Sequence, residues 1–215
     1  TPFGIDIQKF TKNEKIRNDD KIVIGIIKTL SPKYGIDDFI KAISILREKL
    51  INEGKPEVAL KIQGKIYGDG EQKLELEQMI SKLELDNIVS LEGKIPYNQV
   101  PSVLNEFDIF CATSISESFG VAVVEAMATE LPVVATDALG FKEVVDDGIT
   151  GLIARRKSPQ EIACALKKLI LDKSLRESMG IHGRKKVIEL YNWDDNVSTM
   201  EQIYHQAVSD ESFVN

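Results

Sequence analysis

Two glutamates enclose the segment of the sequence that is best suited to bind an anionic ligand. Glu117 and Glu125 are separated by seven residues, in which a polar loop containing Ser118 gives way to a helix beside Gly120. The unsatisfied N–H groups and the partial positive charge at a helix N-terminus attract anions. Small residues at this point let a phosphate approach the backbone. The segment therefore predicts a phosphate site at the start of the helix.

The second glutamate, Glu125, is predicted to be buried. Its helix is apolar on nearly every side, and a buried carboxylate is costly unless it is hydrogen-bonded or paired. Two hydroxyls on adjacent ribose carbons would satisfy both of its oxygens. Glu117 would then lie closer to whatever the phosphates carry, for which a hydroxylated sugar is the natural partner. The alternative is structural: Glu125 pairs with a basic side chain in the core, and Glu117 is a solvated surface group.

Lys28 and Lys33 are the candidate cations of this site. Both lie in the loop that follows the first predicted strand. Two cations at the mouth of a sheet can neutralise a diphosphate, and they can stabilise it as a leaving group while negative charge develops. Most loop lysines are merely solvated. Their position at the end of the strand is what favours a functional role.

Short apolar runs alternate with helical patterns along the whole chain. The predicted strands are Ile22–Ile27, Val58–Ile62, Ile88–Leu91, Asp108–Ala112, Pro132–Thr136 and Gly151–Ala154. The predicted helices are Phe39–Leu50, Leu74–Leu83, a short one near Val100, Gly120–Thr129, Lys142–Val145, Pro159–Leu171, Leu175–Leu190 and Asp194–Val208. This order predicts an α/β fold: a Rossmann-like, open, mostly parallel sheet of about six strands flanked by helices, with an all-helical C-terminal region.

Sheets of this kind bind ligands beyond the carboxyl ends of their strands, where the strand order reverses. The loops expected at that edge are rich in glycine, which suits close approach of a ligand to the backbone. They are Lys28–Gly35, Gly64–Gly70, Gly93–Pro96, Thr113–Gly120 and Thr136–Phe141. The candidate carboxylates and lysines therefore belong to one edge of the sheet.

Composition excludes several classes of protein. The 215 residues carry a formal net charge of -7 with dispersed basic residues, which argues against a nucleic-acid partner. Cys111 and Cys164 have apolar neighbours, so we predict two buried thiols in a reducing compartment, the cytoplasm. No apolar run is long enough to span a bilayer, and no signal-peptide pattern opens the chain. Adjacent acids such as Asp146-Asp147 have no His or Cys cluster beside them, so we expect neither a metal nor another cofactor.

Two other nucleotide-binding classes lack their motifs here. A dinucleotide-binding dehydrogenase needs G-x-G-x-x-G after the first strand, where this chain has Lys28-Thr29-Leu30-Ser31-Pro32-Lys33. Gly68-Asp69-Gly70 continues without the third glycine. A nucleoside triphosphatase needs G-x-x-x-x-G-K-[ST], which does not occur in the sequence.

A series of motifs, in order along nearly the whole chain, resembles the C-terminal domain of group 1 (family 4) retaining glycosyltransferases of two-domain GT-B architecture. The matching stretches are Phe3-Gly4-Ile5-Asp6 with Phe10, Gly25 to Gly35, Gly68-Asp69-Gly70, Leu91 to Ile95, Glu117 to Ala128, Leu131 to Ala135, Glu143 to Leu152, and Tyr191 to Tyr204. The two glutamates are moderately specific alone and highly specific with their flanking sequence.

The resemblance implies a role for each matching position. Glu125 would hold the ribose hydroxyls of a nucleotide-sugar donor, Glu117 would face the donor sugar, and Lys28 and Lys33 would bind the diphosphate. The other donor-binding residues that it implies are Gly68, Gly93, Lys94, Ile95, Ser118, Phe119, Gly120 and Val121. The family transfers the sugar with retention, to a carbohydrate or lipid-linked acceptor, and needs no metal to bind the donor.

The resemblance also implies that part of the active site is missing. Residues 1–190 would form the nucleotide-sugar-binding domain, and residues 191–215 a helix that crosses to an N-terminal acceptor domain. We expect this chain alone to be a fragment that binds donor weakly and transfers little sugar, while membrane association of the full-length protein stays open. The alternative is a non-catalytic sugar-nucleotide-binding module that keeps the pocket.

Four features depart from the family pattern. Phe3 replaces a common Asn before Gly4, with no clear chemical consequence. Lys28 stands where Arg is usual and keeps the charge without the bidentate fork. Glu130 replaces a glycine that ends the helix, which predicts a less favourable cap. Leu139-Gly140 replaces Gly-Gly, which leaves open how closely the backbone approaches the donor sugar.

Overall fold

The computed structural model describes residues 4–13 and 20–209. Phe3, the start of the predicted domain 1–190 and the end of the predicted helix 191–215 lie outside the described residues. Six strands form one parallel sheet in the order β3-β2-β1-β4-β5-β6. The strands are β1 (Ile22–Ile27), β2 (Ile62–Tyr67), β3 (Val89–Gly93), β4 (Ile109–Ala112), β5 (Val133–Thr136) and β6 (Gly151–Ala154). This arrangement confirms the predicted fold class.

The strand order reverses next to the first strand. β1 pairs with β2 on one side, where Ile24 lies opposite Gly64, and with β4 on the other, where Ile24 lies opposite Ile109. The chain thus winds outward from β1 in both directions. The carboxyl ends of β1 and β4 form the topological switch point, which is where open α/β sheets bind ligands.

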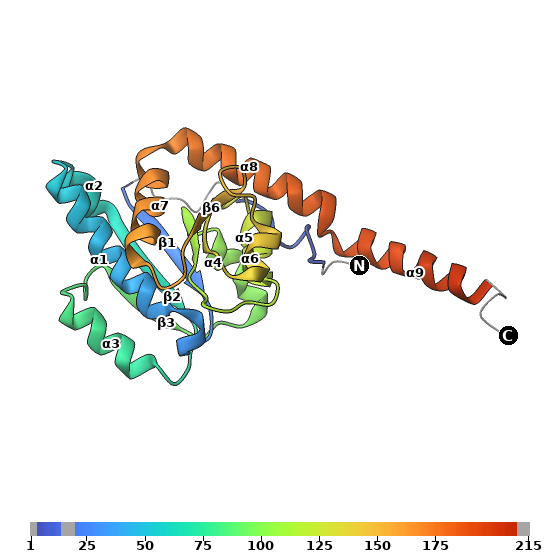
Figure 1. Cartoon of the computed structure of the whole chain (residues 1–215), viewed down its shortest axis with the longest axis horizontal. Coiled ribbons are helices and arrows are strands. Elements are labelled where there is room, and N and C mark those ends of the chain that lie inside the picture. The colour runs from blue at the N-terminus through green and yellow to red at the C-terminus, as the bar shows by residue number, and fades with distance from the viewer. Residues whose placement is uncertain (1–3, 14–19, 210–215) are drawn as a thin grey trace.

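Helices cover both faces of the sheet, and the whole forms three layers (Figure 1). The α-helices are α1 (Ile36–Asn52), α2 (Pro56–Lys61), α3 (Lys73–Lys82), α4 (Val100–Leu104), α5 (Val121–Ala128), α6 (Leu139–Val144), α7 (Pro159–Leu171), α8 (Lys173–Leu190) and α9 (Trp193–Ser209). The 3-10 turns are η2 (Pro32–Tyr34) and η3 (Tyr97–Gln99). One apolar core lies under α1, α3 and α7, and the other under α4, α5 and α6.

Alternation along β1 explains why one strand serves both cores. Ile24 and Ile26 are buried in the core beneath α1 and α7, whereas Val23 and Ile27 pack against the core beneath α4 and α5. Gly25 lies between them, and a Cβ built on it would lie 2.1 Å from the Phe107 ring. The glycine therefore makes room for an aromatic side chain at the centre of the sheet.

The prediction of a strand over Val58–Ile62 was wrong. Pro56 begins α2, which continues to Lys61, and the strand is β2, from Ile62 to Tyr67. Pro is favourable in the first turn of a helix. The true strand was obscured because Gly64 and Lys65 interrupt its apolar pattern. A Cβ on Gly64 would contact Val89 on the neighbouring strand β3 and Phe39 on the covering helix α1.

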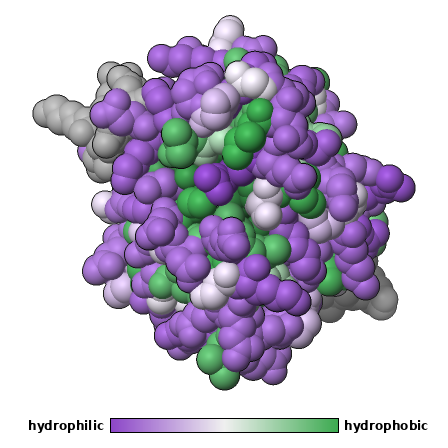
Figure 2. Space-filling view, turned by 90° about the vertical axis from the view of Figure 1, so that its left-hand side faces the viewer, coloured by the Kyte–Doolittle hydropathy of each residue, from purple (hydrophilic) through white to green (hydrophobic). Residues whose placement is uncertain are grey.

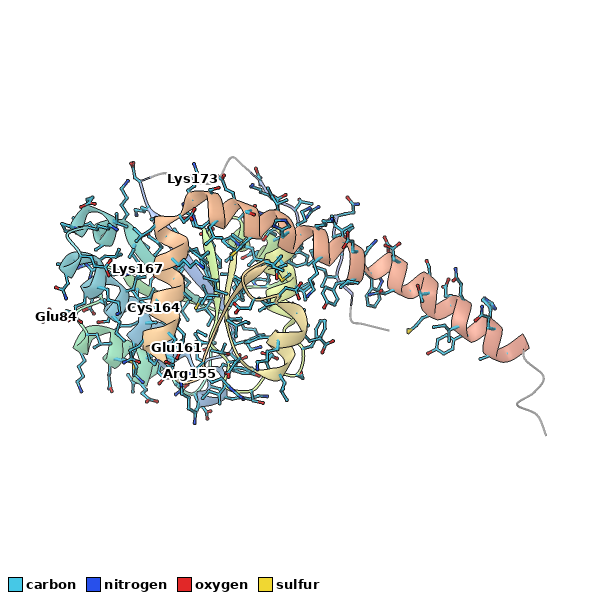
Figure 3. The ribbon with its side chains drawn as sticks, turned by 45° about the horizontal axis from the view of Figure 1, so that its top comes forward. Glu84, Arg155, Glu161, Cys164, Lys167 and Lys173 are labelled. Carbon is cyan, nitrogen blue, oxygen red and sulfur yellow. The ribbon has the colours of Figure 1, made fainter. Side chains whose placement is uncertain are left out.

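The prediction of two buried thiols was half right. Cys111 is fully buried in β4, and burial raises the pKa of its thiol. Cys164 is exposed on α7, near the labelled Glu161 and Lys167 (Figure 3). The buried face of α7 is formed by Ile162, Ala163 and Leu166 instead, so the apolar neighbours of Cys164 in the sequence lie on the other side of the helix.

The last helix, α9, extends away from the rest of the molecule (Figure 1). Large apolar side chains along it are exposed, among them Trp193 (52%), Tyr204 (64%) and Val208 (87%). By contrast, the face drawn in Figure 2 is mostly hydrophilic around a few apolar residues near its middle. The helix is thus not docked on this domain along its length.

Candidate functional site

The carboxyl edge of the sheet brings Lys28 and Glu117 into direct contact. Lys28 Nζ lies 2.6 Å from Glu117 Oε2, and the two side chains are only 25% and 12% exposed. Lys28 directly follows β1, and Glu117 lies in the loop after β4, on the two sides of the switch point. Two of the predicted catalytic residues therefore form a partly buried ion pair there.

Lys33, the third predicted catalytic residue, contacts the same aromatic ring as Lys28 does. Lys28 Nζ and Lys33 Nζ lie 4.5 and 5.4 Å from the centroid of the Tyr34 ring. Tyr34 ends η2, and Gly35 follows with a φ of 59°, a left-handed conformation that suits glycine. The ring of Tyr34 thus holds two cations at the mouth of the sheet.

The loop after β4 is fixed by its neighbours. Thr136 Oγ1 donates a hydrogen bond of 2.6 Å to the Ser114 carbonyl, and Ser114 Oγ donates one of 3.3 Å to Glu117 Oε2. Ile115 N donates to the Lys33 carbonyl at 2.9 Å, and Arg156 Nη1 to the Ile115 carbonyl at 3.1 Å. These contacts from three different segments position Glu117 before any ligand binds.

The start of α5 lies beside this loop. Gly120 precedes the helix with a φ of 104°, and no side chain caps the helix there. A Cβ on Gly140 would lie 2.5 Å from the Phe119 backbone nitrogen, so Gly140 is required where α6 approaches the loop. Leu139 is 80% exposed and leaves that approach unobstructed. The predicted Ser118, Phe119 and Gly120 thus form a tightly packed backbone at a helix N-terminus.

Glu125 is buried on α5, as predicted, with only 5% of its surface exposed. Within residues 4–13 and 20–209, it forms no ion pair, and its Oε1 has no hydrogen-bond partner. Tyr97 and the Lys9 ammonium are the groups that act on its charge. Burial raises the pKa of Glu125 to about 7, against the lowering effects of Tyr97 and of the Lys9 ammonium. The alternative of a core ion pair is therefore not what the described residues form.

A cavity of about 680 Å³ lies beside Lys28 and the loops after β2 and β3, and its volume is typical of small-molecule sites. Lys28, Gly68, Lys94, Ile95 and Tyr97 belong to its lining. Gly68 N donates to the Gly93 carbonyl at 2.9 Å, and this bond ties the loops after β2 and β3 together. The predicted base-side residues and the predicted diphosphate residue therefore border the same space.

A second cavity, of about 420 Å³, lies at the other edge of the sheet. Ile22, Asp108 and Pro132, at the amino ends of three strands, contribute to its lining. Ligands of such sheets bind at the carboxyl edge. We therefore assign the candidate site to the 680 Å³ cavity and the start of α5.

Tyr97 and Arg156 are the residues of this site that the sequence analysis missed. Tyr97 directly follows the predicted loop Gly93–Pro96, so an aromatic residue at a strand-end loop was the available signal. Arg156 follows β6 and also donates to Asp137 at 3.0 Å. Nothing in the spacing of Arg156 relates it to the loop after β4.

Among the described residues, no group of three or more His, Cys, Asp or Glu side chains could hold a metal ion. In the same part of the chain, no helix is both long and apolar enough to cross a bilayer.

The fold and the site define a class: an α/β domain with an ion pair at the switch point of its parallel sheet, the place where such sheets bind ligands. Residues 7–186 match the family model of glycosyl transferases group 1, and the chain belongs to that family.

Individual relatives agree with this assignment. The chain is 31% identical to an uncharacterized glycosyltransferase of Methanocaldococcus jannaschii, over 94% of this chain and 54% of that protein. It is 28% identical to the C-terminal domain of the group 1 glycosyl transferase LpcC from Francisella tularensis, with a TM-score of 0.77 over 88% of this chain and all of that one. Anabaena HepE in complex with UDP-glucose is 25% identical, with a TM-score of 0.79 over 96% of this chain and 56% of that one. The chain spans about half the length of the curated relatives that it matches.

Proposed function

We propose that this chain binds the nucleotide-sugar donor of a retaining, metal-independent glycosyltransferase. The observation that carries the proposal is Glu125, a carboxylate buried on a short helix with no cation paired to it among the described residues. A buried carboxylate with an unsatisfied oxygen is unfavourable unless it is used. Ribose hydroxyls would supply the missing donors.

The other roles follow from the positions of the residues around Glu125. The base would lie in the 680 Å³ cavity beside Gly68, Gly93, Lys94 and Ile95. The diphosphate would lie between Lys28, Lys33 and the backbone N–H groups at Phe119, Gly120 and Val121. The UDP-glucose complex of HepE supports a donor of this kind.

Transfer would begin as the bond between the anomeric carbon and the diphosphate oxygen breaks. Negative charge then develops on the diphosphate, where the ammonium groups of Lys28 and Lys33 stabilise it. Lys28 would leave Glu117 for the diphosphate, and Glu117 would become free to accept hydrogen bonds from the sugar hydroxyls. The acceptor oxygen would bond to the anomeric carbon on the face from which the diphosphate leaves, which retains the configuration, and its proton would pass to the departing diphosphate oxygen.

Sugar transfer to a carbohydrate or lipid-linked acceptor would need the remainder of the protein. Relatives are about twice as long, and α9 carries exposed apolar residues such as Trp193, Met200 and Tyr204. We propose that these residues contact an N-terminal acceptor domain, and that the protein works in the cytoplasm. This chain alone would then bind donor weakly and transfer little sugar, because half a cleft leaves the phosphates in water.

Calorimetric titration with UDP, GDP and ADP tests the proposal. The chain is titrated first without metal and then with EDTA, beside Glu125→Ala and the control Glu77→Ala, which changes an exposed glutamate of α3. We expect one nucleotide to bind in both buffers, and binding to be lost in Glu125→Ala alone. Binding abolished by EDTA would refute metal independence. Equal binding by Glu125→Ala and the wild type would refute the role of Glu125.

A further inference from the structure

The loop that carries Glu117 is tied to a charged side chain that follows β6. Arg156 donates from Nη1 to the Ile115 carbonyl at 3.1 Å and from Nε to Asp137 Oδ1 at 3.0 Å. The Arg156 backbone N–H donates to the same carboxylate oxygen at 2.9 Å. Asp137 directly follows β5, and its own N–H donates to the Ala154 carbonyl at 2.9 Å. One guanidinium therefore joins the loops after β4, β5 and β6.

Ile115 is held on both sides, two positions before Glu117. Its N–H donates to the Lys33 carbonyl at 2.9 Å, and its carbonyl accepts from Arg156. The bond to Lys33 joins two neutral backbone groups, whereas a hydrogen bond from a guanidinium is charge-assisted and stronger. The Glu117 carbonyl accepts from Gly140 N at 3.2 Å. The backbone from Ile115 to Glu117 is thus anchored at each end.

The ion pair with Lys28 restrains the Glu117 side chain only while that pair is intact. In the proposed donor complex Lys28 would turn to the diphosphate, and Glu117 would then lose this partner. The hydrogen bonds of Arg156 involve neither Lys28 nor a diphosphate. They can therefore hold the loop in both states of the site.

We propose that Arg156 is a positioning residue for Glu117: its guanidinium bridges Asp137 and the Ile115 carbonyl, and thereby sets how tightly the protein binds the sugar of the donor. This inference rests on the proposed donor site. The Arg156 and Asp137 side chains are 42% and 28% exposed, so water weakens their attraction and the expected effect is moderate.

A cation near a phosphate site can also act through its charge alone. A charge effect would weaken the binding of nucleotide and of sugar nucleotide alike, whereas loss of a positioning contact weakens only the part that depends on Glu117. Arg155 provides a matched control, because it precedes Arg156 and pairs with Glu161 of α7 instead (Figure 3). Arg155→Ala removes the same charge at the neighbouring position and leaves the Ile115 carbonyl bonded.

Calorimetry compares the wild type, Arg156→Ala, Arg156→Lys and Arg155→Ala. The probes are UDP, GDP and ADP, followed by the glucose, mannose and N-acetylglucosamine esters of the nucleotide that binds best. We expect Arg156→Ala to bind the tightest ester roughly three- to tenfold more weakly, and the free nucleotide within a factor of about two. Arg156→Lys should lose ester affinity as well, because lysine keeps the charge but not the planar fork. Arg155→Ala should match the wild type with both ligands.

A double variant tests whether Arg156 acts through Glu117. If it does, adding Arg156→Ala to Glu117→Ala should cost no further ester affinity. Hydrogen exchange followed by mass spectrometry adds a readout without ligand. The Ile115 amide should exchange faster in Arg156→Ala than in the wild type or Arg155→Ala, since its bond to Lys33 loses its support.

Four results would overturn the role of Arg156 and leave the donor site standing. They are an unchanged ester affinity of Arg156→Ala, an equal loss of nucleotide and ester affinity, full recovery by Arg156→Lys, and unchanged exchange of the Ile115 amide. A further loss of ester affinity in the double variant would show that Arg156 does not act through Glu117, and would overturn it too. Failure of the wild type to bind any of the nucleotides would overturn the proposed function, and this inference with it.

Discussion

Replacing Glu125 with glutamine should make the protein more stable at alkaline pH. The pKa of Glu125 is about 7 in the folded chain, against 4.5 for an ordinary glutamate. The folded state therefore binds a proton more tightly than the unfolded state does. As pH rises from about 4.5 to about 7, the free energy of unfolding falls, because ionisation in the folded state requires a desolvated charge.

The magnitude follows from the difference between the two pKa values. A difference of about 2.5 corresponds to about 3 kcal/mol over the whole range, of which about 2 kcal/mol falls between pH 5.5 and pH 8. Glutamine does not titrate, so Glu125→Gln should gain this amount relative to the wild type between those two pH values. For a chain of this size the gain equals about 4–8 °C in Tm.

Urea unfolding followed by circular dichroism at pH 5.5 and pH 8 measures the effect. Comparing each variant with the wild type removes the contributions of all other titrating groups, as well as any pH-independent cost of the amide. Glu77→Gln, at an exposed position of α3, is the control and should show no change of this size. The reasoning is refuted if the difference between Glu125→Gln and the wild type is the same at both pH values.

Three further predictions concern the fold. Gly25→Ala should destabilise the chain by about 1–3 kcal/mol in urea, since the new Cβ would overlap the Phe107 ring, and unchanged stability would contradict the packing described between β1 and that ring. Iodoacetamide should label Cys164 in the native protein and Cys111 only after unfolding, as mass spectrometry would detect. Deleting residues 198–215, all exposed where they are described, should change the free energy of unfolding by less than about 0.5 kcal/mol; a larger loss would mean that α9 packs on this domain.

The sequence predicted most elements because their signals are local. Gly151–Ala154 and Pro159–Leu171 have the predicted bounds, since one is a short apolar run and the other begins with proline and has one apolar face. Val58–Ile62 failed because a short apolar run fits either a strand or a helix. The strand is identified by the packing of Gly64 against Phe39 of α1, a contact that exists only in the folded protein.

The residue after the C-cap of α5, Glu130, was predicted to end the helix less favourably than glycine would. Glu130 has a φ of 57°, the left-handed conformation that usually requires glycine. Its side chain accepts a hydrogen bond of 2.9 Å from Lys12, and a Cβ on Gly180 would lie 2.2 Å from its carbonyl oxygen. The less favourable cap was predictable from the residue type, but the contacts that enclose it come from segments 50 or more positions away.

The pairing within the site could not be predicted, because each partner lies on a different loop. Residue types indicated that Lys28 and Glu117 both belong to the site, but they did not indicate that the two side chains, 89 positions apart, pair with each other. Local pattern governs whether a side chain is buried. Which polar group reaches it depends on strand order, and the strand order is a property of the whole sheet.

The ion pair between Lys28 and Glu117 changes how the charge of the site should be understood. The sequence suggested two cations awaiting a diphosphate, but in the structure one of them is already neutralised by a carboxylate 2.6 Å away. In the proposed donor site, a diphosphate would have to exchange partners with Glu117, and the cost of releasing a partly buried carboxylate would reduce the net gain. Glu117 would be freed only when a phosphate takes its cation. The pair would then couple capture of the diphosphate to the availability of the carboxylate that is proposed to face the sugar.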